Sequence, residues 1–187
     1  MALLNPALLE PNLILGNTIF HLTPEIIRRH QLKGLILDVD DTLVSVRQVN
    51  PSDDLLRWST EMKRVADIWL VSNNLSQRRI SRIAEALDLP YLLGAKKPSR
   101  KKLRKAMDAM DLRPHEVAMV GDRLFTDVLA GNRLGLFTIL VEPMVDPLEA
   151  SRKHPVRNAE VWVSKVLGAS LDGIKQGFTK TNKKKSS

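Results

Sequence analysis

The feature that constrains this chain most is residues 34–44, where a short apolar run breaks into three carboxylates within four residues. Such a run fits a strand that is buried on both faces of a sheet. Because side chains alternate along a strand, Asp38 and Asp40 point to the same side where the strand ends. Two carboxylates so close repel each other unless a cation lies between them or one is protonated. The pattern predicts a site for a hard divalent ion such as Mg²⁺, with a polar turn that only ends a strand as the alternative.

More polar positions stand at or just after apolar runs downstream, and they are Ser72, Lys97, Asp122 and Asp127. Taken singly, each is a weak signal, because strand-end hydroxyls, surface lysines and helix-start carboxylates are common. In parallel sheets, however, ligands bind outside the carboxyl ends of the strands. The order of these residues along the chain therefore predicts that they converge on one site.

Helical and strand patterns alternate along the chain. Apolar residues recur at three- and four-residue intervals in segments that predict helices at residues 52–65, 77–87 and 99–110. Short apolar runs predict strands at residues 34–37, 68–71, 90–94, 117–120 and 137–141. This alternation predicts an α/β fold of the doubly wound, three-layer type with a mainly parallel five-stranded sheet.

The composition restricts the cellular setting. The chain has 187 residues and no cysteine, so disulfides and zinc–thiolate sites are excluded, which suits a reducing cytoplasm. Prolines and polar residues interrupt its apolar beginning, and the first positive residue is Arg28, so neither a secretory signal nor a membrane-spanning helix is predicted. We expect a cytoplasmic protein, peripheral at the membrane surface if its basic clusters bind lipid.

The positive charge is concentrated in two places. The net charge is +8, and residues 151–187 hold nine Lys or Arg against Glu160 and Asp172. Residues 96–105 hold seven more positive residues in ten positions. Such clusters attract polyanions, either nucleic acid or an anionic lipid surface. The alternative is a solvated face followed by a solubilising tail.

The motifs resemble those of the haloacid dehalogenase-like (HAD) phosphatase superfamily, whose signatures follow one another in this order. Within it, residues 5–22, 38–43, 71–74 and 121–135 resemble the YqeG family of subclass IIIA phosphatases, and the resemblance extends over roughly residues 5–145. One departure is Asp41, where that family often carries Asn. Its charge would lie beside the metal.

The resemblance implies a division of the chain. Residues 34–145 would form the HAD-like catalytic core, and residues 1–33 an arm that packs on it, with a shallow membrane contact as the sharper alternative. Residues 146–177 would form an amphipathic helical segment, and residues 178–187 a disordered basic tail. Many relatives insert a cap domain between the motifs, but a helix and a strand already fill each gap here, so no cap domain is expected.

The resemblance also implies roles for the site residues. Asp38 would be the nucleophile that forms an aspartyl-phosphate, and Asp40 the general acid and then the general base. Mg²⁺ would be held by the Asp38 carboxylate, the Asp40 backbone carbonyl and Asp122, with Asp127 orienting the metal shell. The phosphoryl group would be bound by Ser72, Asn73 and Lys97, with Thr42 in support.

Together these signals favour a Mg²⁺-dependent phosphomonoester hydrolase. An uncapped site suits a phosphate on a large or membrane-displayed substrate, such as phosphatidylglycerophosphate, the substrate of related fungal and plant enzymes. One alternative is a phosphatase for soluble nucleotide, sugar or protein phosphates. Another is a nucleic-acid- or ribosome-associated binding module with vestigial activity, which the complete motif set does not favour.

Overall fold

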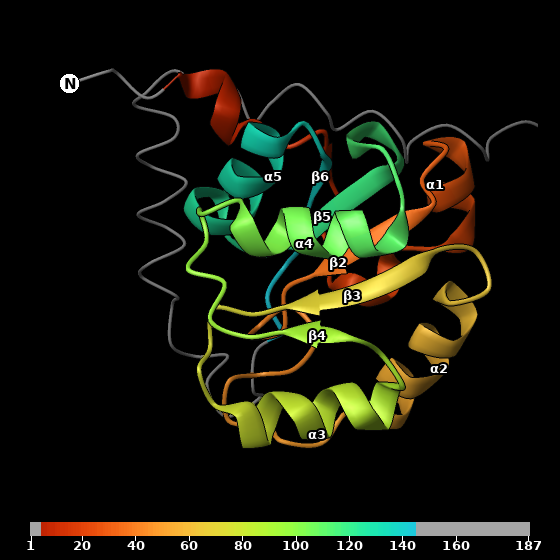
Figure 1. Ribbon diagram of the computed structural model, residues 1–187. Helices are drawn as coiled ribbons and strands as arrows, with labels where there is room; N and C mark the ends of the chain where they lie inside the picture. Colours follow the sequence, from red (N-terminus) through yellow and green to blue (C-terminus); the bar gives the residue numbers. More distant parts are fainter. Residues whose placement is uncertain (1–4, 145–187) are drawn as a thin grey trace, which may run out of the picture.

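One parallel sheet of six strands, in the order β1-β6-β5-β2-β3-β4, forms the centre of the molecule (Figure 1). The computed structural model describes residues 5–144. The predicted helical segment at 146–177 and the tail at 178–187 lie outside this range. The strands are β1 (Leu13–Ile14), β2 (Gly34–Leu37), β3 (Asp67–Val71), β4 (Tyr91–Leu92), β5 (Val117–Gly121) and β6 (Phe137–Leu140).

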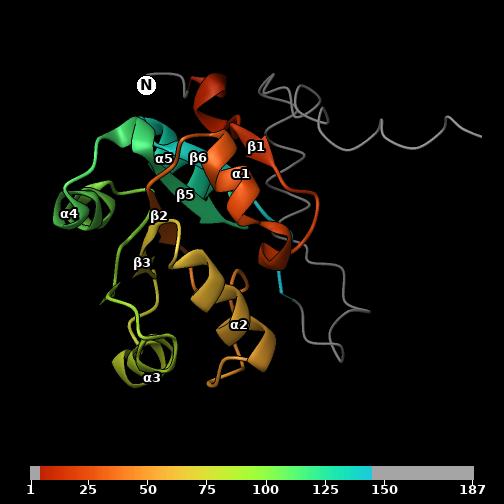
Figure 2. The same cartoon turned by 90° about the vertical axis from the view of Figure 1, so that its right-hand side faces the viewer.

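Helices cover both faces of the sheet, as the alternating pattern predicts (Figure 2). On one face lie α1 (Pro24–Arg29), α2 (Asp53–Met62) and α3 (Gln77–Leu87), and on the other lie α4 (Lys101–Met110) and α5 (Leu129–Leu134). Short 3-10 turns occupy Pro6–Leu9, Ile19–His21 and Pro114–Glu116, and a π-helical turn, Leu124–Val128, precedes α5. The doubly wound, three-layer prediction is confirmed.

Strand β2 shows how sequence alternation divides the core between these two layers. Leu35 and Leu37 pack with α1, α2 and α3, whereas Ile36 between them packs with α4 and α5. All four β2 residues are buried, as expected for a strand with helices on both sides. The core therefore consists of two apolar layers that hold β2 at the middle of the sheet.

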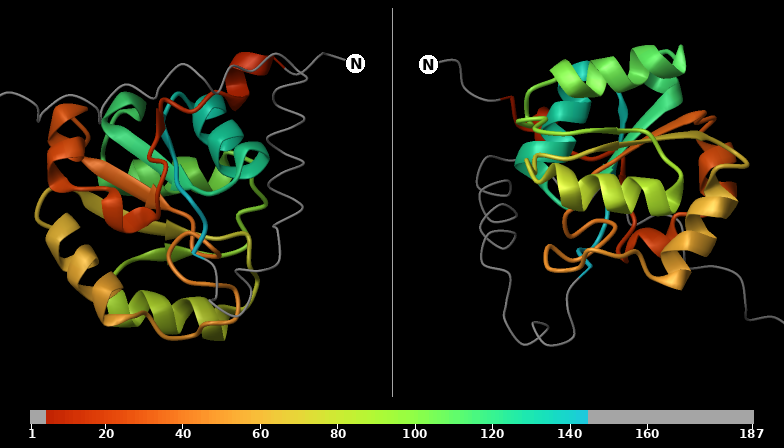
Figure 3. Two further views of the ribbon diagram at one scale, coloured as in Figure 1. Left: turned by 180° about the vertical axis from the view of Figure 1, so that it is seen from behind. Right: turned by 60° about the horizontal axis from the view of Figure 1, so that its bottom comes forward.

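The sheet has one strand more than the sequence predicted, because the N-terminal arm supplies β1 at its edge. Leu13 and Ile14 pair in parallel with Ile139 and Leu140 of β6 (Figure 3). The arm also buries apolar side chains on the domain, namely Leu9, Ile19 and Leu22. A two-residue strand between prolines is too short to show a period-2 pattern, so the sequence could not reveal it.

The helix starts agree with the sequence at α2 and differ at α4. Ser52 caps α2, because its Oγ accepts a hydrogen bond from the backbone N of Leu55 at 3.2 Å. At α4 the predicted segment begins at residue 99, whereas the helix begins at Lys101, with Arg100 at the cap position and no side-chain cap. Within residues 5–144, no helix is both long and apolar enough to cross a membrane.

Candidate active site

The predicted site residues meet at the carboxyl edge of the sheet, where the segments after β2, β3, β4 and β5 lie side by side. Asp38 directly follows β2, and its backbone N donates to the Val120 carbonyl of β5 at 3.0 Å. The chain proceeds from β2 outward to β3 and β4, then crosses back to β5 and β6 on the other side. The edge between β2 and β5 is thus the switch point at which doubly wound sheets bind ligands.

Three buried carboxylates form the centre of the site. One oxygen from each of Asp38, Asp122 and Asp127 can be chosen so that all three lie within 4.8 Å of one another. The side chain of Thr42, which is fully buried, donates from Oγ1 to Oδ1 of Asp122 at 3.3 Å. Thr42 thus lies beside the cluster with a carboxylate as its partner, and its predicted role in supporting the phosphoryl group stays a prediction.

Lys97 supplies the cation that faces these carboxylates. Its Nζ lies 2.6 Å from Oδ1 of Asp38 and 2.7 Å from Oδ1 of Asp127, and its side chain is 1% exposed. Burial by itself lowers the pKa of Lys97, but the charges of Asp127 and Asp38 outweigh it and raise that pKa above its ordinary value. Lys97, and not its exposed neighbour Lys96, is therefore the lysine of the site, and it remains charged.

One lysine does not neutralise three carboxylates. Burial raises the pKa of Asp38 to about 7, against the opposing charge of Lys97. Burial, reinforced by the charges of Asp127 and Asp38, raises the pKa of Asp122 to about 8. Asp127 Oδ1 is buried and accepts no well-directed hydrogen bond, although Lys97 is close to it. A buried set of oxygen donors with excess negative charge fits a hard divalent cation such as Mg²⁺.

The side chain of Asp40 lies outside the carboxylate cluster and points to α3. Its Oδ2 accepts a hydrogen bond from Ser72 Oγ at 3.2 Å, and its Oδ1 accepts one from the guanidinium of Arg79. Asp40 is not among the side chains that could share one ion, so its predicted place in the metal shell depends on the backbone carbonyl alone. Sequence reasoning missed Arg79, whose only signal is its place in the first turn of the helix after Ser72.

The side chain of Asn73 forms hydrogen bonds with the backbone of Lys97, in the loop between β4 and α4. Its Oδ1 accepts from the backbone N of Lys97 at 2.7 Å, and its Nδ2 donates to the Lys97 carbonyl at 3.4 Å. Both contacts hold the backbone that carries Lys97, and the peptide bond to Pro98 is cis. In this structure Asn73 positions Lys97, while its predicted phosphate contact stays a prediction.

Two backbone features explain residue choices around the cluster. Asp41 has φ +60, a left-handed conformation that Asp and Asn tolerate better than most residues. Its Oδ1 accepts from the backbone N of Val46 at 3.3 Å, which is a second reason for a short acceptor side chain here. At Gly121, a Cβ would lie 2.3 Å from Asp127 Oδ2, so only glycine allows Asp127 to approach.

The comparisons with known proteins agree with this geometry. A family model described as HAD-hydrolase-like matches residues 94–164, which include Lys97, Asp122 and Asp127. The "Probable phosphatase YqeG" of Bacillus subtilis is 41% identical over 127 residues, which cover 67% of this chain and 73% of that protein. The chain belongs to the YqeG family of HAD-like phosphatases. It is a phosphoric monoester hydrolase.

One further relative and one solved structure are also similar to this chain. The chloroplastic and mitochondrial phosphatidylglycerophosphate phosphatase 1 of Arabidopsis thaliana is 29% identical over 157 residues, covering 76% of this chain but 45% of that longer protein. The crystal structure of an uncharacterized protein from Listeria monocytogenes serotype 4b superposes with a TM-score of 0.51. Its identity is 15%, over 72% of this chain and 99% of that one, so it supports the fold alone.

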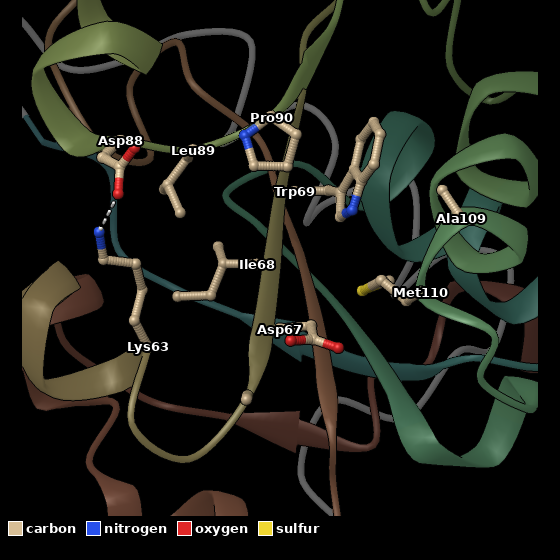
Figure 4. A pocket seen from close by; sticks show the side chains of 10 residues that line it. Lys63, Asp67, Ile68, Trp69, Asp88, Leu89, Pro90, Ala109 and Met110 are labelled. Atoms are coloured by element: carbon tan, nitrogen blue, oxygen red, sulfur yellow. Dashed lines mark hydrogen bonds and ion pairs between the residues drawn. The ribbon is translucent and has the colours of Figure 1, made fainter.

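A cavity lies away from the carboxylate cluster, at the opposite edge of the sheet. It has a volume of about 380 Å³ and is lined by the start of β3, the segment before β4 and the end of α4 (Figure 4). Lys63 and Asp88 form an ion pair of 3.2 Å across its rim. None of the predicted site residues lines it, so it has no part in the phosphatase chemistry.

Proposed function

We propose that this protein is a Mg²⁺-dependent phosphatase that works through an aspartyl-phosphate on Asp38, with a phospholipid headgroup, phosphatidylglycerophosphate, as substrate. The observation that carries the chemical part is the buried contact of Asp38 with Lys97 beside Asp122 and Asp127. The proposed nucleophile thus has a fixed cation and a set of oxygen donors beside it, which supports the proposal. A structural ion pair would need neither the further carboxylates nor the switch-point position.

In the first step, a carboxylate oxygen of Asp38 attacks phosphorus and forms a new O–P bond. The bond from phosphorus to the ester oxygen breaks, and that oxygen takes a proton from the carboxyl group of Asp40. The products are the free alcohol, an aspartyl-phosphate on Asp38 and ionised Asp40. Asp38 must be ionised to attack, and the charge of Lys97 opposes the effect of burial on its pKa.

In the second step, water attacks the aspartyl-phosphate and gives a proton to ionised Asp40. The bond from phosphorus to the Asp38 oxygen breaks, inorganic phosphate leaves, and both carboxyl groups return to their starting states. Ser72 Oγ donates its one proton to Asp40 at 3.2 Å and so orients the carboxyl group that gives and takes the proton, while its predicted contact with a phosphoryl oxygen stays a prediction.

The residues that would hold Mg²⁺ are Asp38, Asp122 and Asp127, with the backbone carbonyl of Asp40. When bound, the ion would neutralise the carboxylates and screen the negative charge of the phosphate from that of the nucleophile. Without the ion, the positive charge of Lys97 offsets part of the negative charge of the carboxylates. Thr42 holds the orientation of Asp122 through its hydroxyl.

The lipid substrate is supported first by the uncapped arrangement. Between Asp38 and Ser72 the structure has only a loop, α2 and β3, and between Ser72 and Lys97 only α3 and β4. No inserted domain closes over the site within residues 5–144. Such a site accepts a phosphate on a large carrier, and the plant relative carries the name of a phosphatidylglycerophosphate phosphatase.

The loops around the site give a second argument, from their charge and exposed apolar side chains. Within the described residues, the large hydrophobic side chains that are exposed are Val46, Val49 and Leu75, and all three lie in the loops after β2 and β3. Residues 42–52, 72–81 and 93–102 contain no Asp or Glu but several Lys and Arg. We call these three segments the site rim. Apolar side chains among positive charges fit an anionic lipid surface better than nucleic acid, and this would hold the enzyme at the cytoplasmic face of a membrane.

The test is the release of inorganic phosphate from phosphatidylglycerophosphate in mixed micelles with Mg²⁺, for wild type and Asp38→Asn. Asn keeps the shape of the side chain but removes its nucleophilic charge, so we expect a loss of at least about a thousandfold. Asp67→Asn, an exposed carboxylate at the opposite edge of the sheet, is the matched control and should keep full activity.

Each other outcome changes the conclusion in a defined way. If the lipid is inert but p-nitrophenyl phosphate is hydrolysed with the same dependence on Asp38, the mechanism stands and the substrate is a soluble phosphate ester. If Asp38→Asn hydrolyses both as fast as wild type, the nucleophile is wrong. If wild type hydrolyses neither with any divalent metal, the proposed chemistry is wrong.

A further inference from the structure

The side chain of Arg79 is largely covered at the site, unlike the other two arginines of the same helix. It is 11% exposed, whereas Arg78 and Arg82 are exposed to solvent. Its helix, α3, begins shortly after Ser72 and packs on the sheet through Ile80 and Ile83. The packing of the helix therefore fixes the position from which Arg79 reaches the loop after β2.

Each nitrogen of the Arg79 guanidinium has a different acceptor. Nε donates to the Gln48 carbonyl at 2.9 Å, Nη2 donates to the Ser45 carbonyl at 3.0 Å, and Nη1 donates to Oδ1 of Asp40. A guanidinium is planar and rigid, so three bonded nitrogens fix its plane. One side chain thus joins α3, the backbone at residues 45–48 and the carboxylate of Asp40.

Asp40 is in turn held at both of its oxygens. Arg79 donates to Oδ1, and Ser72 Oγ donates to Oδ2 at 3.2 Å. These two donors come from different segments, so the carboxylate cannot rotate without breaking one of the bonds. Hydrogen bonds to charged groups are stronger than those between neutral groups, so the two bonds keep one orientation dominant.

We infer that Arg79 is a positioning residue for proton transfer by Asp40. It sets the position of the Asp40 carboxyl group relative to the ester oxygen that leaves, and it acts through Asp40 without touching the reacting phosphoryl group. The inference rests on the proposed function, in which Asp40 gives its proton to that oxygen. A lysine would keep the charge but could not bond all three acceptors in one plane.

The test compares Arg79→Ala with wild type on two phosphate esters that differ in their leaving group. A simple alkyl ester such as glycerol 3-phosphate needs a proton on the departing oxygen, whereas p-nitrophenolate leaves readily without one. We expect kcat/KM to fall about 10- to 100-fold for the alkyl ester and about threefold or less for p-nitrophenyl phosphate. KM for both should change little, because the phosphate-binding groups are intact.

Four comparisons separate positioning from a general loss of structure. Arg82→Ala, on the same helix and exposed, should leave both values of kcat/KM unchanged. Arg79→Lys should show the same selective loss as Arg79→Ala, since a lysine lacks the planar fork. Added guanidinium should restore part of the alkyl-ester activity of Arg79→Ala and none of that of Arg79→Lys. In the metal-free protein, amide hydrogen exchange at residues 45–48 should be faster in Arg79→Ala than in wild type. This measurement tests the contacts of Arg79 with that backbone independently of catalysis.

Several results would overturn the inference. Equal losses on both esters, or a loss that appears mainly as a higher KM, would mean that Arg79 binds the phosphate directly. Unchanged activity, or full activity in Arg79→Lys, would mean that the fork is not needed. If Arg79→Ala does not fold, Arg79→Lys decides by the same selectivity. Inactive wild type would overturn the proposed function together with this inference, whereas an active wild type with unselective Arg79 variants would overturn the inference alone.

Discussion

At the scale of the residue, Asp122 shows how the site opposes the stability of the fold. Burial and the neighbouring charges of Asp127 and Asp38 raise its pKa to about 8. The folded protein therefore binds a proton at Asp122 that the unfolded chain has already released. A carboxyl whose pKa is raised on folding stabilises the fold fully at acid pH and loses that contribution as pH rises, here between about pH 4 and pH 8.

This linkage predicts a pH-dependent effect of the metal on stability. Without metal, the melting temperature should fall as pH rises from 5 to 8, by an amount equivalent to a few kcal/mol. Mg²⁺ should raise the melting temperature more at pH 8 than at pH 5, because at pH 5 protons already neutralise the cluster. In Asp122→Asn, the metal-free fall with pH should be smaller and the effect of Mg²⁺ lost.

Thermal melts in chelator and in Mg²⁺, each at both pH values, check this prediction. Asp67→Asn removes one carboxylate at the far edge of the sheet and should behave like wild type. A steep pH dependence and an intact Mg²⁺ effect in Asp122→Asn would contradict the assigned cluster.

At the scale of the element, the N-terminal arm is joined to the sheet by side chains as well as by β1. Oδ1 of Asn12 accepts from the backbone N of Thr138 at 2.8 Å and from its Oγ1 at 3.0 Å. Thr138 Oγ1 in turn accepts from the backbone N of Asn12 at 3.1 Å. Asn132 of α5 completes the junction, because its Nδ2 donates to the arm carbonyls of Leu8 and Glu10.

Asn12→Ala should therefore loosen the arm from β6. It removes the side-chain acceptor of the backbone N of buried Thr138, although the Thr138 hydroxyl can still donate to Oδ1 of Asn132 at 3.0 Å, so we expect a loss of about 1–3 kcal/mol in the free energy of unfolding. Urea denaturation followed by circular dichroism measures this loss. Asn17→Ala is the matched control, since within residues 5–144 the Asn17 side chain accepts only from the backbone N of its neighbour Thr18, at 3.0 Å. An equal effect of the two substitutions would argue against the junction.

At the scale of the whole molecule, the site rim is the surface that the proposed function turns toward a lipid membrane. Leu75 is 78% exposed, and it lies against Gly94, in the loop that carries Lys97. Val46 stands in the segment at residues 45–48 that Arg79 ties to α3. A lipid surface against the rim would present its headgroups to the site.

Vesicles that contain anionic phospholipid should therefore bind the protein, and the binding should weaken as salt rises. Leu75→Glu should weaken it by about tenfold, because it replaces a side chain that inserts with a charge that is repelled. Vesicle co-sedimentation at low and at physiological salt measures both effects. Ala109→Glu adds the same charge at an exposed position near the opposite edge and should change binding little. No binding at low salt, or equal effects of the two substitutions, would count against this orientation.

The sequence by itself determined the α/β fold and the members of the carboxylate and lysine cluster. Asp38, Ser72, Lys97 and Asp122 each follow a predicted strand, and parallel strands carry their carboxyl ends to one edge. Local patterns therefore suffice to predict that these residues meet, because strand pairing in a parallel sheet aligns the strand ends. The same reasoning gave the two-sided helix cover and the burial of β2.

Only the tertiary structure decided which atoms meet across segments that no local pattern connects. Arg79 is one of several arginines in α3, and nothing in the spacing distinguishes the one that reaches Asp40. Asn73 forms hydrogen bonds with the backbone of Lys97, and Asn12 forms them with Thr138, near the other end of the described chain. These pairings depend on the packing of helices against strands distant in sequence. Hydrogen-bond partners are fixed by that packing, while the sequence fixes only which residues are capable of forming them.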